Sequence, residues 1–161
     1  MDVTGPWICD TCGESIEKPE NGRVEWLTKY DGNHPAGRDL RIVHHVTRSP
    51  LGGSKGCYPD EHAENVKDGS VVTSFPLDDA LGPDGLVRLL TILEDSELPA
   101  PVVNRVIMRL FIPGYEQARP YFKRAVAEGV VEPNLPDGYF FQHQLRAIID
   151  GIARPQNREQ A

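Results

Sequence analysis

Two cysteines separated by two residues are the part of this sequence best suited to chemistry. Cys9 and Cys12 are followed directly by Gly13, in the stretch Cys-Asp-Thr-Cys-Gly. A tight turn of this length directs both sulfur atoms toward one ion, and the glycine suits the unusual dihedral angles of such a turn. Thiolates at this spacing are typical ligands of zinc. The pattern therefore predicts half of a tetrahedral zinc site.

The other two ligands must come from more distant sequence. Cys57 is the only remaining cysteine, so we predict it as the third ligand. His44, His45 and His62 are candidates for the fourth. His44 falls on the apolar face of an alternating run, where zinc would satisfy the nitrogen of a buried imidazole, so we favour it. The alternatives stay open, because His45 falls on the opposite face and His62 follows Cys57 by five positions.

The predicted site, formed by Cys9, Cys12, His44 and Cys57, would hold one Zn²⁺. Four protein ligands close the coordination shell, so this zinc would be structural. The alternative is that Cys9 and Cys12 are free thiols that act as a redox pair. Pairs of the thioredoxin type lie between a strand and a helix of an α/β unit, and no such pattern surrounds these two cysteines.

The elements that must position these ligands follow from the hydrophobic pattern. Residues 23–30 and 40–47 alternate between apolar and polar side chains, which predicts a β-hairpin with a long loop. A short helix is expected over 59–67, with Pro59 near its first turn.

Helical periodicity dominates the second half of the chain. It predicts helices over 86–96, 101–111, 115–128 and 141–152, of which the third is interrupted by Pro120. Residues 129–132 and 139–141 could pair as a small hairpin that an Asp-Gly turn closes.

These elements predict an α+β chain, with a small zinc-bound β-hairpin module followed by a mostly α-helical one. We place the zinc-binding β-rich module at 1–69, a linker at 70–83, the helical module at 84–154 and a flexible tail at 155–161.

The order of the Cys9–Cys12 turn, the hairpin and Cys57 near a short helix resembles zinc-ribbon and treble-clef modules over residues 7–66. The resemblance implies a zinc ion and a compact shape, and it implies no particular activity. The helical part is similar to a winged helix-turn-helix, with the hairpin as its wing. That likeness would place Arg105 and Arg109 on the second helix, and Arg119, Lys123 and Arg124 on the third.

One family that is related to the treble-clef modules consists of enzymes. The stretch around His44 and His45, followed by Gly52-Gly53, resembles the strand and loop of HNH-type nucleases. The resemblance implies that His44 would bind a divalent ion and His45 would be the general base. The family also expects an asparagine about 15 residues on, whereas Asn65 comes 20 residues after His45.

Composition and charge limit the function further. The chain has 39% hydrophobic residues and a net charge of −7, and its first 82 residues carry 14 acidic against 8 basic side chains. Such an acidic surface disfavours general binding of phosphate or anionic lipid. Without a membrane span or a secretory signal, we expect a cytoplasmic protein.

The leading hypothesis is a non-catalytic, zinc-stabilised binding or regulatory protein whose partner is another protein or a second copy of this chain. DNA is an option through the C-terminal helices. The alternative is the HNH-like nuclease.

Overall fold

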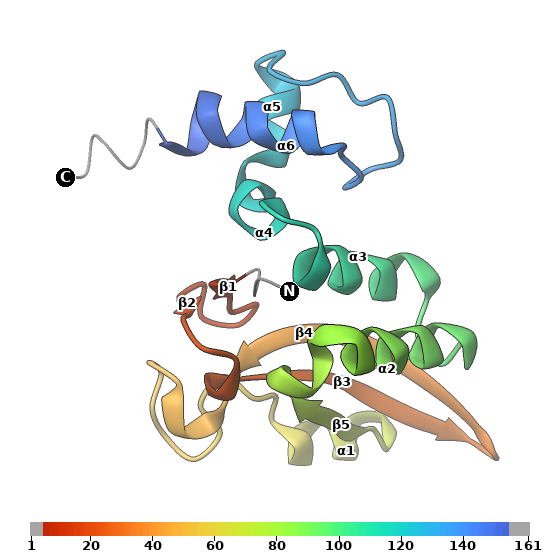
Figure 1. Cartoon of the computed structure of the whole chain (residues 1–161). Helices are drawn as coiled ribbons and strands as arrows, with labels where there is room; N and C mark the ends of the chain where they lie inside the picture. The colour runs from red at the N-terminus through yellow and green to blue at the C-terminus, as the bar shows by residue number, and fades with distance from the viewer. Residues whose placement is uncertain (1–4, 155–161) are drawn as a thin grey trace. The chain divides into compact units, whose positions relative to one another are not determined.

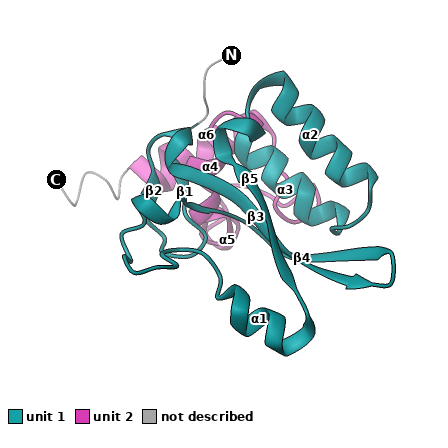
Figure 2. Cartoon of the chain, turned by 90° about the horizontal axis from the view of Figure 1, so that it is seen from below, with its two compact units in different colours: residues 1–110 teal, residues 111–161 magenta. Residues whose placement is uncertain are grey.

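The structure is a computed structural model that describes residues 5–154. The chain divides into two compact units, Met1–Leu110 and Phe111–Ala161 (Figure 2). Compactness does not measure independent folding, so the module boundaries at 69 and 83 stay a prediction. The predicted tail at 155–161 lies outside the described residues.

The first unit contains a small two-stranded sheet, a three-stranded antiparallel sheet and three α-helices (Figure 1). Its strands are β1 (Trp7–Ile8), β2 (Ser15–Ile16), β3 (Gly22–Asp31), β4 (His34–His44) and β5 (Val71–Pro76). Its α-helices are α1 (Glu61–Asp68), α2 (Gly82–Glu94) and α3 (Ala100–Phe111), and short 3₁₀ turns cover Pro19–Asn21, Val46–Arg48 and Leu77–Ala80.

The predicted hairpin is present as β3 and β4, but its long loop is wrong. Pairing continues to Asp31 and His34, so only Gly32 and Asn33 remain for the turn. Gly32 has φ 61°, a conformation that glycine adopts without strain. The end of the hairpin is exposed on both faces, so its residues carry no alternation by which the strands could be recognised.

Strand β5 falls in the segment that the sequence predicts as a linker. It pairs antiparallel with β3, from Arg23 opposite Pro76 to Thr28 opposite Val71, and completes the order β4-β3-β5. β3 is thus the central strand and is the most completely buried of the three.

Helices α2 and α3 lie on one side of the sheet and α1 on the other (Figure 1). Trp26 of β3 packs with Leu98 and Val103, which come from the α2–α3 connection and from α3. Partly buried side chains surround this cluster: Leu40, Phe75, Ile92, Leu93 and Ile107. Burial of this apolar surface holds both helices on the sheet that positions the candidate ligands.

The second unit is helical. Its described α-helices are α4 (Tyr115–Ala118), α5 (Phe122–Ala127) and α6 (Gln142–Ile148), with a 3₁₀ turn at Arg119–Tyr121 and a π-helical end at Ile149–Ala153. The predicted interruption at Pro120 is confirmed, since Pro120 lies in the 3₁₀ turn that separates α4 from α5. Proline cannot donate the backbone hydrogen bond that a continuous α-helix needs.

The small hairpin expected over 129–141 is wrong. In the structure these residues form turns and irregular backbone without a strand. Val130 and Val131 instead donate backbone hydrogen bonds to the carbonyl oxygen of Ala125, at the end of α5. The Asp-Gly signal marks a loop in which Gly138 has φ 83°, and its carbonyl accepts a hydrogen bond from the Tyr115 hydroxyl.

The α+β class is confirmed, with antiparallel sheets in the N-terminal part followed by several helices. Among the residues that the structure describes, none of the helices has the length and apolar character needed to cross a membrane.

Candidate metal centre

Cys9 and Cys12 lie in a tight turn between β1 and β2. The two strands pair antiparallel, with Trp7 opposite Ile16 and Ile8 opposite Ser15. The amide of Gly13 donates to the carbonyl oxygen of Cys9 at 3.0 Å, and Gly13 has φ 77°. This conformation strains any residue with a Cβ, which explains the glycine after the second cysteine. We call the segment from Cys9 to Gly13 the knuckle.

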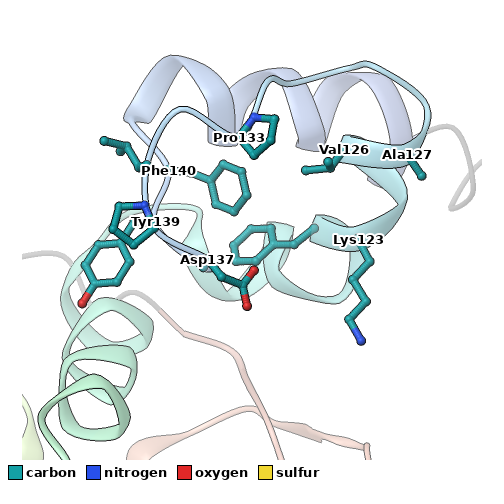
Figure 3. Close-up of a pocket in the computed structure, with 11 residues that line it drawn as sticks. Lys123, Val126, Ala127, Pro133, Asp137, Tyr139 and Phe140 are labelled. Atoms are coloured by element: carbon teal, nitrogen blue, oxygen red, sulfur yellow. The ribbon is translucent and has the colours of Figure 1, made fainter.

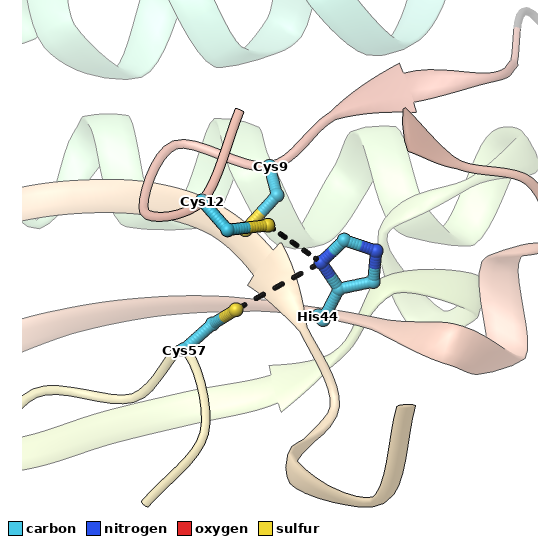
Figure 4. Close-up of side chains that lie close together, drawn as sticks. All are labelled: Cys9, Cys12, His44 and Cys57. Carbon is cyan, nitrogen blue, oxygen red and sulfur yellow. Dashed lines mark hydrogen bonds between the residues drawn. The ribbon is translucent and has the colours of Figure 1, made fainter. Parts of the chain in front are cut away.

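The structure brings the four predicted residues together. The ligand atoms of Cys9, Cys12, His44 and Cys57 all lie within 4.8 Å of one another (Figure 4). The Nδ1 atom of His44 lies 3.4 Å from the sulfur of Cys12 and 3.9 Å from that of Cys57. Cys9, His44 and Cys57 are buried, and Cys12 is half-buried. Three segments far apart in the sequence therefore meet at one point.

His44 is the last residue of β4, and its ring is held in one orientation. Its Nε2 atom donates a hydrogen bond to the backbone carbonyl oxygen of Ser15, at 3.0 Å. Because a carbonyl oxygen only accepts, the proton of the neutral ring must be on Nε2. Nδ1 then carries the lone pair, and it faces the sulfur atoms. Metal-binding histidines commonly have such an outer partner.

Cys57 is held by the loop that follows β4. The Thr11 hydroxyl, in the knuckle, donates to the carbonyl oxygen of Cys57 at 2.8 Å. The hydroxyl of Ser49 lies 2.9 Å from the Cys57 sulfur, within hydrogen-bond distance of a thiolate. These contacts fix the loop against the knuckle and place the third sulfur beside the first two.

Two buried thiols of the cluster have very different pKa values. Burial raises the pKa of the Cys9 thiol, but backbone hydrogen bonds from Cys12, His44 and Thr11 outweigh it and lower the pKa to about 7. Burial raises the pKa of the Cys57 thiol to about 11, against the opposing effect of the Ser49 hydroxyl. A divalent cation would favour the thiolate form of each.

The donor set and its dimensions fit a single zinc ion. Zinc bonds of about 2.3 Å to sulfur and about 2.0–2.1 Å to nitrogen, in tetrahedral geometry, place neighbouring ligand atoms about 3.5–3.8 Å apart. The distances from His44 Nδ1 to the sulfur atoms of Cys12 and Cys57, 3.4 and 3.9 Å, lie close to that range. Three cysteines and one histidine are a donor set of structural zinc sites. Cys9, Cys12, His44 and Cys57 thus form a plausible mononuclear zinc site.

The other two candidate histidines lie outside the cluster. His45 is exposed, and its Nδ1 contacts the Thr47 hydroxyl at 3.0 Å. His62 is exposed on α1. Because His44 lies among the three thiols, the geometry gives no support to a second, separate metal ion at His44 such as the nuclease resemblance implies.

Sequence reasoning missed the residues that orient the ligands. Ser15 acts through its backbone carbonyl, so its side-chain identity carries no signal of this role. Ser49 and Thr11 are small hydroxyl residues in polar loops, where such residues are common for other reasons. Their roles become visible only when the loop and the knuckle are placed side by side.

A separate apolar pocket lies in the second unit (Figure 3). It has a volume of about 320 Å³, and the rings of Phe122 and Phe140 meet in it with centroids 4.4 Å apart. Lys123 and Asp137 are the charged residues among those that line it. The lining is mainly apolar, which distinguishes this pocket from the metal centre.

No protein-family model matches this chain, and no curated protein or solved structure is significantly similar to it.

Proposed function

We propose that this chain is a non-catalytic, zinc-stabilised binding or regulatory protein. The observation that carries the proposal is the convergence of four ligand atoms within 4.8 Å, three of them on buried residues. Four protein ligands complete the tetrahedral shell of zinc, so no coordination position is left for a substrate or an activated water. Zinc in such a site fixes structure.

In the proposed role, the ion joins the knuckle, the end of β4 and the loop before α1. The middle of this loop is exposed at Leu51, Gly52 and Gly53, and both glycines have positive φ. Zinc would replace the apolar core that so short and glycine-rich a segment does not build. The ligand order favours the resemblance to zinc-ribbon and treble-clef modules, which we include in the proposal.

We favour a protein partner, including a second copy, over DNA. Two of the helical cations that the winged-helix likeness assigns to DNA form ion pairs: Arg119 pairs with Glu116, and Arg124 with Glu128. Arg109 is buried, with 4% of its surface exposed. The net charge of −7 also opposes a duplex. Apolar side chains are exposed on α2 instead, at Val87 and Leu90.

Cobalt substitution tests the closed shell. Co²⁺ bound by three thiolates and one imidazole gives an intense visible spectrum with strong sulfur-to-metal charge transfer. We expect azide or cyanide, at concentrations that do not extract the metal, to leave this spectrum unchanged. A ligand-dependent shift would reveal an open coordination position and would contradict a purely structural site.

Duplex affinity as a function of salt tests the choice of partner. Proteins that neutralise phosphates lose affinity steeply as salt rises, with a slope of about −0.9 for each phosphate contact. We expect weak duplex binding at low salt, with a slope close to zero. A steep slope that is lost in Arg119→Gln and Lys123→Gln variants would overturn the protein-partner proposal in favour of DNA.

A further inference from the structure

Arg109 of α3 connects that helix to the knuckle. Its side chain is almost fully buried, and each of its two terminal nitrogens has a partner in the N-terminal segment. Nη1 donates to Asp10 Oδ2 at 2.6 Å, and Nη2 donates to the carbonyl oxygen of Ile8 at 2.9 Å. The guanidinium therefore bridges the end of β1 and the knuckle, 99 residues away in the sequence.

Asp10 in turn joins the knuckle to the strand that ends in His44. The carboxylate atom that receives Arg109 also accepts the amide of Ile42 at 2.8 Å. The amide of Asp10 donates to the carbonyl oxygen of Ile42 at 2.8 Å. Asp10 lies between Cys9 and Cys12, and Ile42 lies two residues before His44. One carboxylate thus meets α3, the knuckle and β4.

Arg109 is the buried member of this pair, with 5% of its side chain exposed, whereas 21% of the Asp10 side chain is exposed. Removing Asp10 would leave the buried guanidinium without this ionic contact, which costs more than the loss of a fully exposed pair. Arg105, one turn earlier on the same helix, is exposed and provides a natural comparison.

We propose that Arg109 is a positioning residue of the metal centre, which through Asp10 sets the knuckle thiols against His44 and so couples metal binding to the docking of α3. This inference rests on the proposed zinc site. The coupling is reciprocal by thermodynamic linkage: whatever factor docking of α3 adds to zinc affinity, zinc adds to the docking of α3. Zinc occupancy would then control how firmly α3 is held on its unit.

The test compares the zinc affinities of folded variants by competition with a chromophoric chelator. We expect Arg109→Gln to weaken zinc binding by about tenfold, the lower end of the range for outer partners of metal ligands. Arg105→Gln, the control on the same helix, should bind zinc as the wild type does.

A second variant covers the case in which Arg109→Gln does not fold. Asp10→Asn keeps an oxygen that can accept the Ile42 amide but loses the charge that Arg109 recognises. We expect Asp10→Asn to lose zinc affinity by a similar factor. In the double variant Arg109→Gln/Asp10→Asn, the fold-loss of zinc affinity should be much smaller than the product of the two single fold-losses.

Hydrogen exchange of the wild type tests the reverse direction. Removal of zinc should raise the exchange rates of amides in the second half of α3, from Val106 to Leu110, and the increase should be smaller in Arg109→Gln. If wild-type protein binds no zinc, the proposed function itself fails. If the wild type binds zinc and both Arg109→Gln and Asp10→Asn bind it equally tightly, the zinc site stands and the positioning role of Arg109 is overturned.

Discussion

The Nε2 atom of His44 lies 3.0 Å from the backbone carbonyl oxygen of Ser15, and this contact determines that Nδ1 is the ring nitrogen that faces the thiols. Ser15 belongs to β2, two residues after the end of the knuckle. The segment that supplies Cys9 and Cys12 therefore also orients the fourth candidate ligand. This backbone hydrogen bond holds the His44 ring in the orientation that metal binding requires. Outer partners of metal ligands raise metal affinity in this way.

Substitution of a ligand should remove zinc and destabilise the first unit. We expect Cys9→Ser and His44→Ala to lower the zinc content from about one ion per chain to a small fraction of that value. Structural zinc contributes about 10–16 kcal/mol in small zinc-dependent folds, so the loop and the knuckle should lose their order. Elemental analysis together with amide hydrogen exchange measures both effects.

The exposed histidines provide the controls for these substitutions. His45→Ala and His62→Ala remove imidazoles of the same chemistry from neighbouring positions outside the cluster. Both variants should retain full zinc content. Loss of zinc in either control, with retention in His44→Ala, would show that the fourth ligand has been assigned to the wrong residue.

The hydroxyl of Ser49 should tune the affinity of the site. It lies 2.9 Å from the Cys57 sulfur, where a hydrogen bond donated by the hydroxyl would stabilise the thiolate form that binds the metal. We expect Ser49→Ala to weaken zinc binding by about tenfold without loss of fold. Ser54→Ala, in the exposed part of the same loop, is the matched control. Equal affinities in the two variants would exclude a role for this hydroxyl.

Glu25 should give the first unit a distinctive dependence on pH. The carboxylate is buried beside Arg41, at 2.8 Å, and Arg23, at 3.3 Å. Burial raises the pKa of Glu25, and the two arginines offset this only in part. Because the folded pKa exceeds the unfolded one, the folded state binds more protons between the two values. The contribution of Glu25 to the free energy of unfolding therefore falls as pH rises through that window.

Glu25→Gln removes this titration. We expect the unfolding free energy of the variant, minus that of the wild type, to rise with pH from about 4 and to level off above the folded pKa. Urea denaturation at a series of pH values measures the difference. The exposed Glu20→Gln variant should show no such rise. A difference for Glu25→Gln that stays constant with pH would contradict the assignment.

Leu98 tests whether the sheet and the two long helices unfold together. It is 2% exposed and packs with Trp26 of β3 and Val103 of α3. Leu98→Ala should cost about 2–5 kcal/mol, the usual range for a buried leucine, and should shift one common transition. Leu90→Ala, at a half-exposed position on α2, should cost much less. Separate transitions for strands and helices would show that the unit does not unfold cooperatively.

The sequence was sufficient for the parts of the site that depend on local spacing. The Cys9–Cys12 pair and Gly13 define a turn by themselves, and the alternation through β4 correctly predicts that His44 is buried and His45 exposed. Similarly, the period of apolar residues locates α2 and α3 to within a few residues. These features follow from neighbouring residues, so they can be recognised without knowledge of the tertiary structure.

Long-range features could not be predicted in this way. β5 is only six residues long and ends at Pro76, and its position as the third strand follows from its pairing with β3. Arg109 and the exposed Arg105 are both arginines one turn apart on α3. Their residue type therefore does not reveal that Arg109 is buried and bonded to Asp10. Tertiary contacts between segments decide both cases, and spacing along the chain does not report them.

Zinc K-edge X-ray absorption of the purified, untreated protein tests the central claim most directly. We predict about one zinc per chain, with three sulfur atoms at about 2.3 Å and one nitrogen at about 2.0–2.1 Å. In His44→Ala, any residual metal should lose the imidazole scattering. A wild-type spectrum dominated by oxygen or nitrogen, or a protein that folds fully without metal, would contradict the account.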